Sequence, residues 1–120
     1  MATFEVGPGK PYSTMQSAVN AAVAGDTVLV YDAQYNETVT TIASGTATNR
    51  ITIKSNTKHG AIVDGQTVRT SGIRILHDYI TVQGFHVRNV TNIPSSGAAA
   101  VVIGISGDSA NFSELTWCKL

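Results

Sequence analysis

The chain has 120 residues, a formal net charge of +0 and only 13% charged residues. This length fits a single domain with a substantial core. A neutral chain has no general field that attracts DNA or an anionic membrane surface, so we expect neither nucleic acid nor membrane as a partner. β-Branched Thr, Val and Ile are abundant, which favours strands.

A helix is predicted near residues 13–23, inside an N-terminal cap that we assign to residues 1–25. Ser13 and Gln16 have the spacing of a capping box. Small apolar residues then recur at helical spacing, and Gly25 ends the pattern. We expect this helix to cover one open end of the structure that follows.

From residue 26 to residue 120 the chain is predicted to form short strands separated by Gly, Asn, Asp, Ser and Thr. The runs are residues 28–30, 38–42, 51–53, 61–63, 73–75, 80–82, 85–87, 101–105 and 115–120. Strands this short are not stable alone, so they must be built onto one another.

The strands recur as a repeated unit. Ile51 and Ile53 take the place of Ile80 and Val82 one unit on, and Ile62 takes that of Phe85. In the next unit, Val82, Phe85 and Val87 correspond to Leu115, Cys118 and Leu120, and Ile73 and Ile75 correspond to Ile103 and Ile105. Units of three short strands, stacked as coils with alternate residues inside, predict a parallel β-helix of about three coils.

Several motifs then resemble the N-terminal segment of right-handed parallel β-helix proteins of the pectate-lyase type. They are Ala-Gly-Asp at residues 24–26, Tyr-Asn-Glu at 35–37, Ser-Gly-Thr-Ala at 44–47 and the coil at 79–89. The chain is most similar to the family 9 pectate lyases and to the alginate lyase and chondroitinase B group. The resemblance implies a right-handed, all-β parallel β-helix with an N-terminal capping helix, in an extracellular or cell-surface protein.

Such lyases cleave acidic polysaccharides by β-elimination, in which a Lys or Arg acts as the base. In a full-length relative, calcium is the cation that stabilises the developing charge. Here the acidic residues are scattered and mostly in turns. We therefore assign no catalytic residue, no metal ligand and no cofactor to this chain. Asp26, Glu37, Asp64 and Asn89 are interpreted as structural residues that bond the backbone at turns and loops.

Outward-facing residues are the candidates for binding acidic polysaccharide. Strand alternation places Arg74, His86, Arg88 and Lys54 outside, and a uronate chain needs such donors. A non-catalytic structural or carbohydrate-binding module, such as a phage tail fibre or surface protein, stays open as the alternative to a lyase.

The predicted third strand of the last coil runs up to Leu120, so we expect a fragment of a longer β-helix. Cys118 is expected in its core, since the single cysteine of the chain lies between apolar neighbours. An open end with unpaired strand backbone recruits partners, so we expect a homo-oligomer formed through it.

Overall fold

A computed structural model describes residues 2–66, 71–88, 99–103 and 114–116. These ranges contain one helix, α1 (Met15–Ala21). The strands are β1 (Thr3–Val6), β2 (Thr27–Val30), β3 (Ala33–Tyr35), β4 (Val39–Thr40), β5 (Ile51–Ser55), β6 (Ala61–Asp64), β7 (Ser71–Ile75), β8 (Ile80–Gln83), β9 (His86–Arg88), β10 (Ala99–Ile103) and β11 (Glu114–Thr116). In the described part of the chain, no helix has the length and apolar character needed to cross a membrane.

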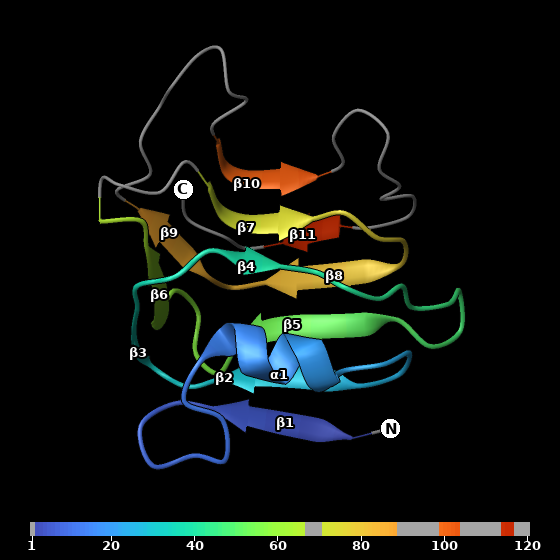
Figure 1. Cartoon of the computed structure of the whole chain (residues 1–120), viewed down its shortest axis with the longest axis horizontal. Coiled ribbons are helices and arrows are strands. Elements are labelled where there is room, and N and C mark those ends of the chain that lie inside the picture. The colour runs from blue at the N-terminus through green and yellow to red at the C-terminus, as the bar shows by residue number, and fades with distance from the viewer. Residues whose placement is uncertain (1, 67–70, 89–98, 104–113, 117–120) are drawn as a thin grey trace.

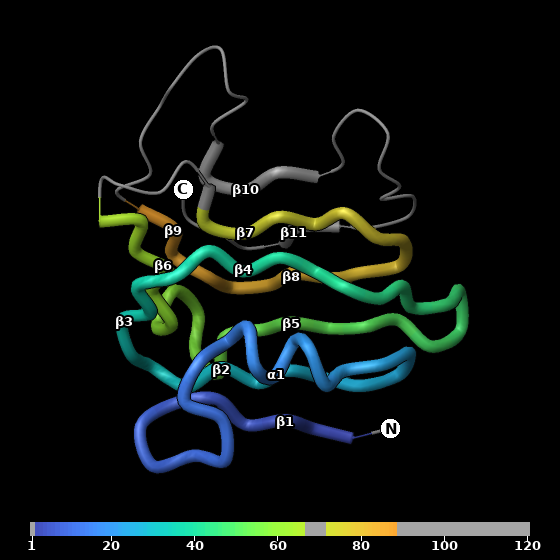
Figure 2. Tube along the Cα trace, viewed as in Figure 1, coloured from blue at the N-terminus to red at the C-terminus, as the bar shows by residue number. Residues whose placement is uncertain are grey.

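The strands form three sheets in which every pair is parallel. The orders are β1-β2-β5-β8-β11, β10-β7-β4 and β3-β6-β9. The strands β2, β3 and β4 fall in three different sheets, and β5, β6 and β7 repeat the same cycle one level up (Figure 1). The backbone trace winds through one strand of each sheet before it rises to the next level (Figure 2). The expected parallel β-helix is therefore confirmed.

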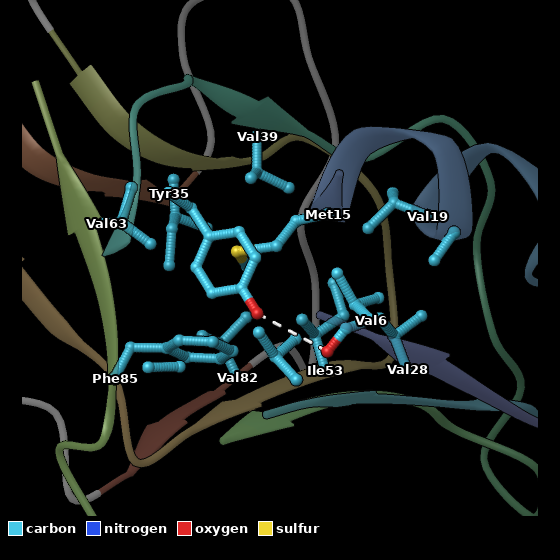
Figure 3. Packing of buried hydrophobic residues seen from close by; sticks show 14 of the residues in the cluster. Val6, Met15, Val19, Val28, Tyr35, Val39, Ile53, Val63, Val82 and Phe85 are labelled. Carbon is cyan, nitrogen blue, oxygen red and sulfur yellow. Dashed lines mark hydrogen bonds between the residues drawn. The ribbon is translucent and has the colours of Figure 1, made fainter. Parts of the chain in front are cut away.

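The core is built from columns of stacked apolar side chains. Val28, Ile53 and Val82 are partners in register on three neighbouring strands, and all three are fully buried. Phe85 and the side chain of Met15 enter the same interior from a turn and from the helix (Figure 3). Each such side chain contributes about 1.5–3 kcal/mol by leaving water, which is why strands of two to five residues suffice.

The helix begins at Met15, and its N-cap is Thr14 rather than the predicted Ser13. Thr14 has an extended backbone, and its side chain accepts a hydrogen bond from the Ser17 N–H at 3.3 Å. Gln16 is thereby too early in the helix for a capping box. Its side-chain amide instead bonds Thr40, accepting from the Thr40 N–H at 2.7 Å and donating to its carbonyl at 2.9 Å.

The helix was expected to cover one open end of the β-helix. These two bonds place α1 more specifically, beside β4. The helix occupies the second sheet's position below β4 and ends that sheet's hydrogen bonding through one amide side chain. The first sheet continues below it, because β1 pairs with β2 from Thr3 to Val6. Residues 1–25 thus contain a strand of the β-helix as well as the helix.

The observed register corrects two of the predicted equivalences. Ile62 lies opposite His86 rather than Phe85. Ile73 and Ile75 pair with Val101 and Ile103, not with Ile103 and Ile105. The predicted match of Leu115 with Val82 is confirmed. The positions of Cys118 and Leu120, on which the expected association depends, lie outside the described residues, so that association stays a prediction.

Candidate functional site

The four predicted binding residues do not form one patch. Lys54 lies on β5 in the first sheet, Arg74 on β7 in the second, and His86 and Arg88 on β9 in the third. A coil with three sheets has three outer faces, so side chains of one coil point in three directions. Only His86 and Arg88 share a face.

Arg88 has a structural partner. Its Nε donates to the Asp64 carboxylate at 3.0 Å, and its Nη2 donates to the Gln34 side chain at 2.9 Å. Asp64 is only 4% exposed, and its other carboxylate oxygen accepts from the Gln66 N–H at 2.7 Å. The interpretation of Asp64 as a turn residue is confirmed. Arg88 neutralises this buried carboxylate and links three neighbouring coils. The predicted turn residue Asn89 lies outside the described residues.

The acids of the two N-terminal motifs are also structural, as predicted. Asp26 accepts hydrogen bonds from the Val23 N–H at 3.0 Å and the Ala2 N–H at 2.9 Å. These backbone bonds, led by that from Val23, lower the pKa of the Asp26 carboxyl. Glu37 accepts from the N–H groups of Met15 and Gln16, both at 3.0 Å, and so completes the first turn of α1.

Among the described residues, three lysine or arginine side chains make neither an ion pair nor a side-chain hydrogen bond: Lys54, Lys58 and Arg74. The other described cations are engaged. Arg50, for example, donates to the Thr81 hydroxyl at 2.9 Å. Since Arg74 lies on another sheet, the only pair of these free cations that meets is Lys54 with Lys58.

Both lysines line a hollow of about 320 Å³ on the outside of the first sheet. The rest of the lining is Leu29, Ser55, Asn56, Gln83 and Gly84. Leu29, Lys54 and Gln83 are neighbours in register on β2, β5 and β8, so the hollow extends across three coils. The described residues that line the hollow carry no carboxylate, and together they form a positively charged surface that suits an acidic ligand.

Hydrogen bonds to the coils above and below fix the turn that carries Lys58. The Asn56 N–H donates to the Val30 carbonyl at 2.7 Å, toward the coil below. The His59 N–H donates to the Gly84 carbonyl at 2.6 Å, toward the coil above. His59 itself has a left-handed backbone, with φ of 64°. Lys58 thus projects from a turn that is anchored on both sides.

Sequence reasoning identified Lys54 but missed Lys58 and the rest of the hollow. Alternation within a strand predicts Lys54 as outward, whereas the direction of a turn residue depends on the coils around it. One signal was present in the sequence. Two lysines four residues apart flank the end of a strand, and no acidic residue lies between them.

The described residues include no group of three or more His, Cys, Asp or Glu side chains that could hold a metal ion. Calcium needs several oxygen ligands at one point, and the acids located above are each bound to backbone or to an arginine.

The parallel β-helix defines the structural class, and known proteins share it. The chain is similar to AlyGC, an alginate lyase of polysaccharide lyase family 6, with a TM-score of 0.72 and 17% identity over 97% of this chain and 15% of that one. It is also similar to a mannuronic acid specific polysaccharide family 6 lyase from human gut microbiota, with a TM-score of 0.68 and 17% identity over 98% of this chain and 26% of that one. This likeness establishes the fold.

A curated relative is more similar in sequence. The uncharacterized protein YwoF of Bacillus subtilis (strain 168) is 31% identical over 111 residues, which cover 87% of this chain and 23% of that protein. No family model matches the chain. The chain spans between 15% and 26% of the length of each of these three proteins.

Proposed function

We propose that this chain supplies the first coils of an extracellular β-helix protein that acts on an acidic polysaccharide, and that the whole protein is a lyase. The observation that carries the proposal is the hollow that Lys54 and Lys58 both line, with no acidic residue among its described lining residues. The fold shared with an alginate lyase and a mannuronic acid specific lyase supports the same class of ligand.

The chemistry of the hollow favours a carboxylated polymer. Ammonium groups donate short, charge-assisted hydrogen bonds to carboxylates, which are about twice as strong as neutral ones. Within the described part of the chain, Lys54 and Lys58 have no ion pair to break before they bind. A linear polymer would find further polar contacts along the three coils that the hollow crosses.

These coils are proposed to hold the polymer rather than to cleave it. β-Elimination needs a base to remove the proton α to the uronate carboxylate and a positive group to stabilise the charge that develops. Lys54 and Lys58 offer positive charge, but we assign the proton transfer to coils in the remainder of the protein, since the related lyases are about four to seven times longer.

Binding and product formation test the proposal separately. Affinity electrophoresis should retard the chain in polygalacturonate, alginate or chondroitin, but not in neutral dextran, and added salt should weaken the effect because exposed charges are screened beyond about 8 Å. Equal retardation in dextran, or none in any acidic polymer, would overturn the proposal.

Absorbance of unsaturated products, with and without calcium, should show no turnover by the 120-residue chain. Turnover that Lys54→Ala abolishes would instead place catalysis in these coils. If a longer protein that contains these coils binds the polymer but releases no unsaturated product, the non-catalytic binding module is the correct alternative.

A further inference from the structure

Gly84 opens the hollow. It follows β8 with a left-handed backbone, φ of 81°, and it lies beside Ser55 of the coil below. Among the described residues, a Cβ added to Gly84 would approach Ser55 Cβ at 3.5 Å and Ser55 N at 4.0 Å, and it would meet none of the others within 4 Å. The described residues therefore leave space for a side chain at this position, and that space adjoins the two lysines.

The polar side chains around that space are available. Neither Gln83 nor Asn56 makes a side-chain hydrogen bond within the described residues, and each carries an amide that both donates and accepts. Leu29 supplies an apolar surface from the coil below. A volume of about 320 Å³ is near the lower end of the range for small-molecule sites, about 300–1,000 Å³.

We infer that the hollow is a built site for one carboxylated sugar ring, and that Gly84 determines its specificity by leaving room for the ring. Lys54 and Lys58 bind the carboxylate, the amides of Gln83 and Asn56 bind ring hydroxyls, and the apolar face of the ring packs on Leu29. This inference rests on the proposed function, which it deepens by separating recognition of a ring from attraction of any polyanion.

Titration calorimetry at low salt tests it with three probes: a galacturonate or mannuronate trisaccharide, the neutral glucose trisaccharide, and sulfate. Gly84→Asn fills the space while keeping a residue that tolerates a left-handed backbone. It should weaken binding of the acidic trisaccharide about tenfold, which corresponds to the loss of one good contact, and it should leave the weak binding of sulfate unchanged. Lys54→Gln/Lys58→Gln should abolish both.

Arg74→Gln is the matched control, because it removes an unpaired cation from a different sheet. It should change neither affinity. The inference is overturned if Gly84→Asn binds the trisaccharide as the native chain does, if Arg74→Gln weakens it as much, or if the neutral trisaccharide binds equally well.

Circular dichroism and the melting temperature establish whether Gly84→Asn is folded. If it is not, Gln83→Ala replaces it, with an expected three- to fivefold loss for the trisaccharide alone. Equal losses of affinity for sulfate and for the trisaccharide would show that binding is only diffuse electrostatic attraction, and they would overturn the inference. If acidic polymers are retarded while no acidic trisaccharide binds, this inference fails and the proposed function stands.

Discussion

Replacing Asp26 by Asn tests the account of the N-terminal coils. The Asp26 carboxylate is 5% exposed and accepts two backbone hydrogen bonds, from Val23 at 3.0 Å and from Ala2 at 2.9 Å. Asn keeps one acceptor oxygen but turns an N–H₂ group toward the other donor. Since a hydrogen bond to a charged group contributes about 1.5–3 kcal/mol, we expect a loss of about 2 kcal/mol in the free energy of unfolding.

Urea unfolding followed by circular dichroism measures this loss, and a thermal melt should show a decrease of about 8 °C. Asp32→Asn is the control: Asp32 is exposed and accepts one hydrogen bond, from the Thr57 hydroxyl, so its change should cost less than about 1 kcal/mol. A loss below about 0.5 kcal/mol for Asp26→Asn would refute the assigned role.

The pH dependence follows from the lowered pKa of Asp26. A carboxyl whose pKa is lower in the folded state than in the unfolded state adds stability at pH values above its unfolded pKa, near 3.8. That stability is lost as the pH falls through the folded pKa. The gap between the native chain and Asp26→Asn should thus be constant near neutral pH and close below about pH 4. A gap that widens in acid would contradict the assignment.

Three further changes test other contacts. Glu37→Ala removes both carboxylate bonds to the start of α1 and should cost about 2 kcal/mol in urea unfolding, whereas Glu37→Gln should recover part of it; equal losses would contradict a role for the acceptor oxygens. Gly45→Ala places a Cβ 2.6 Å from a backbone oxygen, so the melting temperature should fall by more than 5 °C, and an unchanged melt would contradict that packing. Arg88→Ala removes the arginine that pairs with the buried Asp64 carboxylate and should lower the free energy of unfolding by about 2 kcal/mol. Asp64→Asn in the same chain should restore most of this loss.

Much of the fold was predictable, because apolar residues at alternate positions of each strand indicate the stacked columns of the core. Ile51 and Ile53 match Ile80 and Val82 in the sequence and pair in the structure. The strands β1 and β3 were missed, since runs of three or four residues with a single large inward apolar side chain do not stand out from a loop. Both become strands only because a neighbouring coil offers them a partner.

One error in the candidate site comes from the register between coils. Aligning Ile62 with Phe85 instead of His86 shifts the third sheet by one residue and hides the fact that Asp64 lies opposite Arg88. With the correct register, the ion pair between Arg88 and Asp64 could have been anticipated. The direction of Lys58 could not have been anticipated, because hydrogen bonds to two other coils orient its turn.

An amide-resolved NMR titration of the chain with an acidic trisaccharide locates the bound ligand residue by residue. Saturable shifts are expected at Ser55, Asn56 and Gly84, which line the hollow, and none around Arg74 on the second sheet. Shifts confined to Arg74, or to His86 and Arg88 on the third sheet, would contradict this expectation and place the binding surface on another face of the β-helix.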